Sequence, residues 1–224
     1  MDIAIAEKIE KTQRYLGQQQ QEAAIEAAHL AKTILDEILA HIVVGIRESE
    51  VRAFALERFA AHEVERTWHP PYVRFGEHTL HTFQEKGEGD YVLNADDLAF
   101  VDIGIVKNGI EGDAGKTIVF GNNAEFKRIT NTAEQIFREA REFWLSTQPT
   151  GEALYQFIYN RAEALDVAWN LDPAGHLIGA FPHKGWKRGI NHYPLPIEAG
   201  KWILEIQVRH KTLPFGAFFE DLLY

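Results

Sequence analysis

The chain of 224 residues is long enough to bury a hydrophobic core without disulfides or a structural metal. It contains no cysteine, which excludes disulfide bonds and thiolate metal sites, so any metal must be held by oxygen and imidazole ligands. The formal charge of −10 argues against a nucleic-acid partner. The apolar runs fall far short of the roughly 20 residues that a membrane span needs. Because no secretory signal follows Met1, we expect a cytoplasmic protein.

Residues 1–68 have a mainly helical pattern. Apolar residues recur at helical spacing from Ile3 to Ile9 and again from Ile25 to Leu39. Gly45 interrupts the pattern, and a further helix is predicted from Glu48 to Glu65.

The following residues alternate between strand and helix patterns. Apolar runs between Gly-, Asp- and Asn-rich turns predict strands at Tyr72–Phe75, Leu98–Val101 and Thr117–Phe120. Residues 124–168 return to a helical pattern, broken at Pro149–Gly151, and the tail from about 174 is again strand-like.

The order of helices, strands, helices and strands suggests an internal duplication. The helices predicted to begin near Glu48 and Glu152 each carry a large apolar residue six positions later, Phe54 and Ile158. This order favours an α+β fold in which helices cover an antiparallel sheet. No linker rich in Pro, Gly or Ser divides the chain, so we predict one domain.

Two aspartates could carry chemistry. Asp102 directly follows a strand-like run, and Asp113 comes eleven residues later, before the next strand. Neighbouring strands joined by a turn would bring the two carboxylates face to face, where they would repel unless a divalent cation lay between them. The alternative is that both aspartates simply cap turns, where Asp is common.

A histidine and two glutamates in the last third of the chain are further candidates. His176 lies in a glycine-flanked segment, with His183 seven residues later, and imidazole is the commonest metal ligand. Glu205 and Glu220 interrupt or follow apolar runs, where an unpaired carboxylate is costly. Each of them alone also has a structural explanation, such as a structural histidine or a strand glutamate that faces solvent.

Taken together, the order Asp, Asp, His, Glu, Glu resembles the pita-bread metallopeptidases. These are the methionine aminopeptidases, aminopeptidase P and prolidase, together with the metal-free creatinase. The resemblance runs from about residue 25 to residue 224, and the Asp102/Asp113 spacing and the His176/His183 pair are its most specific parts. It implies a pseudo-twofold antiparallel sheet covered by helices.

Many members of this family carry a large extra N-terminal domain, which we do not expect in this protein. The resemblance therefore implies a small, single-domain, Xaa-Pro aminopeptidase-like member. Its one catalytic domain would cover residues 1–224, with residues 1–68 as a mainly helical entry and residues 69–224 carrying the site.

The resemblance also assigns the metal ligands. Asp102 and Asp113 would bind one divalent ion, His176 and Glu205 would complete the second, and Asp113 and Glu220 would bridge the two. The ions could be manganese, cobalt, iron or zinc, because sites of nitrogen and oxygen ligands discriminate poorly between them. A water that bridges the two ions would be the nucleophile.

Catalytic roles follow from the same resemblance. Glu205 would accept a proton. His183 and one upstream histidine would hydrogen-bond the substrate carbonyl or the tetrahedral intermediate. We favour His81 for the upstream position over His78 and His69.

The implied function is a dinuclear metal-dependent exopeptidase, an aminopeptidase or dipeptidase for short peptides that could include Xaa-Pro bonds. The five tryptophans and fourteen phenylalanines could include a homodimer surface, and the alternative is that they lie in the core. The alternatives are a non-catalytic binding module on the same fold and a hydrolase of a non-peptide C–N bond. Leu177, Ile206 and Phe218 depart from residues common in the family, which leaves the five ligands in place but weakens any assignment of the peptide cleaved.

Overall fold

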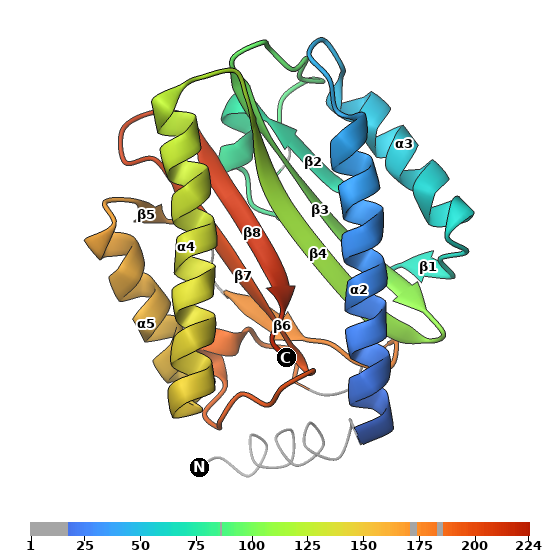
Figure 1. Cartoon of the computed structure of the whole chain (residues 1–224), viewed down its shortest axis with the longest axis vertical. Helices are drawn as coiled ribbons and strands as arrows, with labels where there is room; N and C mark the ends of the chain where they lie inside the picture. Colours follow the sequence, from blue (N-terminus) through green and yellow to red (C-terminus); the bar gives the residue numbers. More distant parts are fainter. Residues whose placement is uncertain (1–17, 86, 171–173, 183–185) are drawn as a thin grey trace.

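A computed structural model of the chain describes residues 18–85, 87–170, 174–182 and 186–224. Its described residues form one eight-stranded sheet with the order β1-β3-β4-β8-β7-β5, while β2 also pairs with β3 and β6 with β7. All of these pairs are antiparallel. Figure 1 shows the long helices α2 and α4 lying across the sheet.

The first half of the described chain contains two helices followed by strands. Its elements are α2 (Gln18–His41), α3 (Glu48–Ala61), β1 (Arg66–Thr67), β2 (Tyr72–Phe75), the 3-10 helix η1 (Gly76–Leu80), β3 (Asp97–Lys107) and β4 (Ile110–Phe120).

The second half repeats this order. Its elements are α4 (Ala124–Thr147), α5 (Gly151–Ala164), β5 (Ala168–Trp169), β6 (Gly175–Leu177), η2 (Ile190–His192), β7 (Trp202–Arg209) and β8 (Gly216–Leu222). Each half ends in a long hairpin, and the second strands of the two hairpins, β4 and β8, pair at the centre of the sheet. The predicted α+β fold with a duplicated, helix-covered antiparallel sheet is confirmed.

The β3–β4 hairpin is set by a two-residue turn. Asn108 and Gly109 both have positive φ, 53° and 72°, as a turn that continues the right-handed strand twist requires. Lys107 therefore pairs with Ile110, and the register continues through all eleven residues of each strand.

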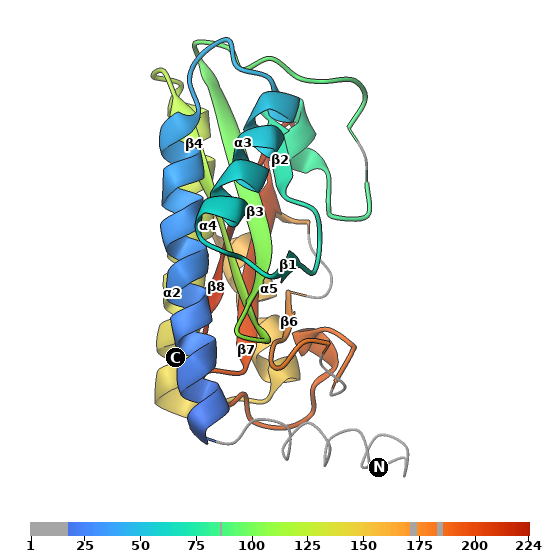
Figure 2. The same ribbon diagram turned by 90° about the vertical axis from the view of Figure 1, so that its right-hand side faces the viewer.

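Helices cover one face of the sheet because their apolar residues recur every three to four positions. On α2 these are buried small and branched residues: Ala24, Ala28, Ala31, Ile34, Leu35 and Ile38. Ala24 and Ala28 pack against residues of β4, β7 and β8, whereas the other four pack with α3 against β3 and β4. A further core cluster lies under α4 and α5. Figure 2 shows α2 and α4 on one side of the sheet and the loops around η1, β6 and η2 on the other.

Some boundaries differ from the sequence prediction. β3 and β4 are longer than the short runs predicted, so Asp102 and Asp113 lie inside strands and not at strand ends. The helix that begins at Glu48 ends at Ala61, four residues earlier than predicted. The helical pattern from Ile3 to Ile9 lies outside the described residues.

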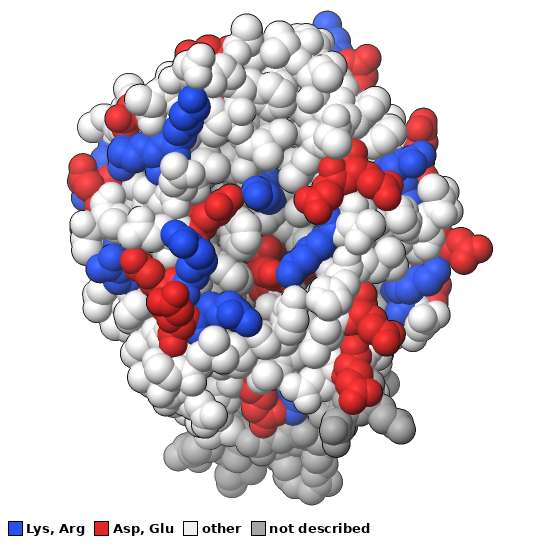
Figure 3. Space-filling view, in the orientation of Figure 1, with Lys and Arg blue, Asp and Glu red and all other residues white. Residues whose placement is uncertain are grey.

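The surface over α2 and α4 carries charges of both signs. In Figure 3, Lys and Arg are interspersed with Asp and Glu among uncharged residues on this face. Ion pairs such as Lys32–Asp221 and Lys116–Glu134 bring opposite charges together. Among the described helices, none has a stretch long and apolar enough to cross a bilayer.

Candidate metal centre

Four carboxylates lie across four adjacent strands, on the sheet face opposite α2 and α4. In the β3–β4 hairpin, Asp102 pairs with Gly115 and Asp113 with Gly104, so the two aspartates are diagonal neighbours on one face and not directly opposite as predicted. Gly115 in turn pairs with Glu220 on β8. Glu220 pairs with Glu205 on β7, and this completes the row.

The two glycines opposite the aspartates make room for other site residues. A Cβ atom at Gly104 would lie 2.3 Å from Trp68 Nε1 and 2.5 Å from His69 Nε2. At Gly115 it would lie 2.7 Å from Glu220 Oε1. Glycine is therefore needed at both positions because another group lies directly against the strand backbone.

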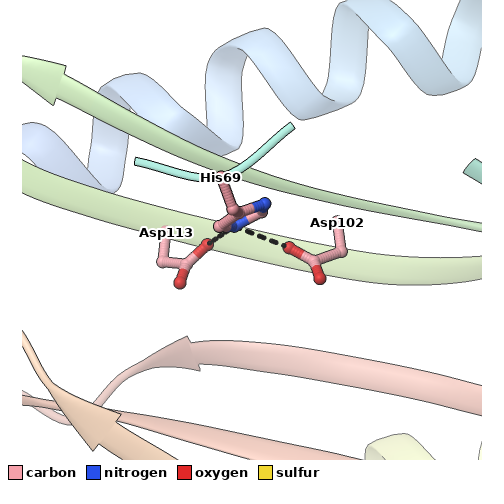
Figure 4. A group of neighbouring side chains, drawn as sticks. All are labelled: His69, Asp102 and Asp113. Atoms are coloured by element: carbon pink, nitrogen blue, oxygen red, sulfur yellow. Dashed lines mark ion pairs between the residues drawn. The ribbon is translucent and has the colours of Figure 1, made fainter. Parts of the chain in front are cut away.

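Two histidines approach the carboxylates from loops and from the short strand β6. His176 Nε2 lies 3.0 Å from Asp113 Oδ2 and 3.6 Å from Glu205 Oε1. His69, between β1 and β2, places Nε2 at 3.4 Å from Asp102 Oδ1 and 3.7 Å from Asp113 Oδ1. Figure 4 shows the ring of His69 above the hairpin, joined by dashed lines to both aspartates.

These groups line a cavity of about 250 Å³. Aromatic rings of Trp68, Tyr72 and Phe83 form part of its wall, and Lys187 and Arg188 add positive charge. The remaining lining residues are His69, Asp102, Asp113, His176, Gly189, Glu205 and Glu220. The cavity thus combines an acidic floor with an apolar wall and cations, which suits a small zwitterionic ligand.

Burial and the proximity of the carboxylates to one another shift their pKa values. Burial, together with the charges of Asp102, Asp113 and Glu205, raises the pKa of Glu220 well above its usual value. Burial also raises the pKa of Glu205 to about 7 and that of Asp102 to about 6. Four carboxylates in this arrangement favour binding of positive charge.

The imidazoles compensate part of this charge. Burial opposes protonation of His69, but the carboxylates of Asp102 and Asp113 outweigh it and raise the pKa of His69 to about 9. The pKa of His176 also rises to about 9, because Asp113 and Glu205 outweigh burial. Burial would raise the pKa of Asp113, but the two histidines outweigh it, so that pKa is lowered.

The donor set fits divalent cations. Asp102 Oδ1, Asp113 Oδ1 and Glu220 Oε1 are buried and accept no hydrogen bond. A buried carboxylate oxygen without a hydrogen bond is costly, and coordination to a metal ion removes that cost. Carboxylate and imidazole ligands suit manganese, iron, cobalt and zinc.

Comparison with known families agrees with this geometry. Residues 22–224 match metallopeptidase family M24. The chain belongs to this family. The predicted relationship to pita-bread metallopeptidases is thereby confirmed.

Solved structures share the fold of this M24 chain. A prolidase from Pyrococcus horikoshii OT3 has a TM-score of 0.78 at 20% identity, over 93% of this chain and 59% of that one. An X-Pro aminopeptidase from Thermotoga maritima MSB8 has a TM-score of 0.76 at 18% identity, over 94% and 60%. A methionine aminopeptidase from Thermotoga maritima has a TM-score of 0.73 at 20% identity, over 92% of both chains. The M24 chain therefore spans about three fifths of the first two proteins. A comparison with curated proteins finds no match.

The structure of the M24 chain brings the five predicted ligands into one cavity, but their binding of metal stays a prediction. They are Asp102, Asp113, His176, Glu205 and Glu220.

Of the two predicted catalytic histidines, the structure describes His81, which does not line the large cavity. His81 lines a smaller cavity, of about 20 Å³, that also reaches Asp102 and Glu205, and its buried Nδ1 has no hydrogen-bond partner. His78 is buried and hydrogen-bonds Glu48 at 3.0 Å. His183 lies outside the described residues.

Sequence reasoning did not place His69 among the metal-site residues. It weighed His69 only as the substrate-contacting histidine and favoured His81. The signal that could have found His69 is the glycine in the middle of a strand at position 104, opposite Asp113. Such a glycine indicates that another group lies close against the strand.

Proposed function

We propose that this M24 chain is a dinuclear metal-dependent exopeptidase, an aminopeptidase or dipeptidase that acts on short peptides. The observation that carries the proposal is the row of four carboxylates on adjacent strands, three of which have a buried oxygen without a hydrogen bond. Burying four neighbouring carboxylates costs free energy, and packing of the sheet does not require it. A purely structural role therefore does not explain the cluster.

The assignment of ligands follows the order of residues in the family. Asp102 and Asp113 would hold one ion, His176 and Glu205 the second, and Asp113 and Glu220 would contact both. Bound divalent ions would polarise the peptide carbonyl and lower the pKa of water, which makes water a nucleophile near neutral pH.

The chain's own residues would position the substrate and move protons. Glu205 lines both the large cavity and the small cavity beside it, so its carboxylate can reach a proton on either side. His81 lies in that small cavity and is our candidate for a hydrogen bond to the substrate carbonyl, together with His183.

The shape of the site favours a short peptide. A cavity of about 250 Å³ has room for one or two residues. Lys187 and Arg188 would attract a substrate carboxylate, and the rings of Trp68, Tyr72 and Phe83 would pack against an apolar or proline side chain. Cleavage of Xaa-Pro bonds, a single catalytic domain, a homodimer and a cytoplasmic location stay predictions.

The experiment combines metal analysis with a peptide panel. Protein prepared without chelator is analysed for metal, then loaded with manganese, cobalt, iron or zinc and assayed on Xaa-Pro and Met-Xaa peptides before and after chelation. We expect about two ions per chain and chelator-sensitive release of the N-terminal residue. If none of the metal-loaded forms cleaves any peptide, the proposal is wrong and the binding-module alternative gains support. Cleavage that persists after complete metal removal would contradict the metal dependence.

A further inference from the structure

His69 lies in the site although it is outside the five-residue ligand set. Its side chain is 12% exposed and is held between two aromatic residues. The Trp68 ring meets it edge-on at 4.4 Å between centroids, and the Tyr72 ring stacks on it at 5.1 Å. The imidazole is therefore held in one orientation and does not sample solvent freely.

The orientation of the ring is defined by its other nitrogen. His69 Nδ1 lies 2.8 Å from the backbone oxygen of Pro70. Because a carbonyl oxygen can only accept, Nδ1 carries the proton of this hydrogen bond, and in the neutral ring Nε2 then presents its lone pair. A histidine that binds a metal through one nitrogen commonly has the other nitrogen hydrogen-bonded to a carbonyl in this way.

His176 shows the same arrangement. Its Nδ1 lies 3.1 Å from the backbone oxygen of Leu177, and its Nε2 lies 3.0 Å from Asp113 Oδ2. His69 faces the opposite oxygen of the same carboxylate, Asp113 Oδ1. The two imidazoles thus flank Asp113, and each has its Nδ1 hydrogen-bonded to the carbonyl of the next residue.

The spacing of the ligand atoms also fits one ion. His69 Nε2 and one oxygen each of Asp102 and Asp113 all lie within 4.8 Å of one another. Ligand atoms about 2.1 Å from a tetrahedral ion are separated by roughly 3.4 Å. The His69–Asp102 and His69–Asp113 separations of 3.4 and 3.7 Å are close to that value.

We propose that His69 is a sixth protein ligand of the metal centre and binds, through Nε2, the ion held by Asp102 and Asp113. This inference rests on the proposed function, since it assumes that those aspartates hold an ion. An imidazole on this ion makes its ligand set richer in nitrogen. Imidazole favours cobalt and zinc more than it favours manganese, so His69 would shift the preference of the centre toward them.

The test measures metal binding and not only activity. The full chain is freed of metal and titrated with Co²⁺ or Mn²⁺ by calorimetry, and the visible absorption of bound Co²⁺ is recorded because its intensity and position report coordination number. The test variant is His69→Gln. The matched control is His62→Gln, because His62 pairs with Glu37 away from the site.

For wild-type protein and His62→Gln we expect two Co²⁺ ions per chain and the same spectrum. For His69→Gln we expect the affinity for one ion to fall by at least about tenfold, with a changed Co²⁺ spectrum and a smaller loss for Mn²⁺. A Co²⁺ affinity of His69→Gln within twofold of wild type, together with an unchanged Co²⁺ spectrum, would overturn the proposal. Wild-type protein that binds no pair of ions would instead contradict the proposed function.

A measurement on the unsubstituted protein covers the case in which His69→Gln fails to fold. Zinc is added to chain labelled with ¹⁵N at histidine, and the imidazole resonances are followed. Two Nε2 resonances of described histidines, those of His69 and His176, should move to metal-bound positions. If only that of His176 moves, His69 is not a ligand.

Discussion

Substitution of Gly104 by Ala tests how closely His69 and Trp68 lie against the sheet. The new Cβ would lie 2.5 Å from His69 Nε2 and 2.3 Å from Trp68 Nε1, whereas ordinary contacts are about 3.5 Å or longer. Both rings must therefore recede by about 1 Å. They belong to a loop, so the expected outcome is a folded protein with a displaced His69.

The expected loss of stability in Gly104→Ala follows from the known cost of overpacking. Adding a methyl group to a filled site costs about 1–3 kcal/mol. For a chain of this length, 1 kcal/mol lowers Tm by about 2–4 °C, so we expect a decrease of about 2–12 °C. Displacement of His69 should also weaken Co²⁺ binding, in the same direction as His69→Gln.

Gly112→Ala is the matched control. Gly112 lies on the neighbouring strand but faces α2, and a Cβ there would lie 2.5 Å from the backbone oxygen of Ala27. This variant should lose at least as much thermal stability as Gly104→Ala while it keeps wild-type Co²⁺ affinity. Thermal denaturation and calorimetry separate the two effects. Unchanged Tm in Gly104→Ala, or equal loss of Co²⁺ affinity in both variants, would refute the reasoning.

Two further predictions concern charge. In metal-free protein the pKa values of His69 and His176, about 9, and of Glu205, about 7, all exceed the ordinary values of 6.5 and 4.5. The folded chain then binds more protons than the unfolded chain between about pH 4.5 and 9. Protonation of these three groups therefore stabilises the metal-free fold at low pH, and this stabilisation is lost as pH rises through that range. We expect Tm of chelated protein to be lower at pH 9 than at pH 6, with the difference reduced by added divalent ions; an equal or higher Tm at pH 9 would contradict this. Glu220→Gln should remove a buried carboxyl group whose ionisation its neighbours oppose, and so leave metal-free stability unchanged or raised, while the number of bound ions falls below two. Asp221→Asn, on the opposite face of the same strand, should lose its ion pair with Lys32 and still bind two ions by metal analysis; equal stoichiometry in both variants would count against the bridging role of Glu220.

The sequence determined the hairpin that carries the two aspartates. Asn108-Gly109 specifies a two-residue turn, and in such a hairpin an odd separation places both residues on the same face. The separation of eleven positions between Asp102 and Asp113 therefore predicts one shared site by local geometry alone. The order of helices and strands likewise predicted the duplicated sheet, because hydrophobic period is a local property.

The tertiary structure decided which remote groups join that hairpin. Pairing of β4 with β8 brings Glu220 beside Gly115, although the two are more than 100 residues apart in the chain. His69 reaches the aspartates because its loop packs against a glycine and its ring is oriented by its neighbour's carbonyl. Such contacts depend on steric fit between distant segments, and no periodicity in the sequence records that fit. The aspartate pair was thus readable from the sequence, whereas the complete set of ligands around it required the fold.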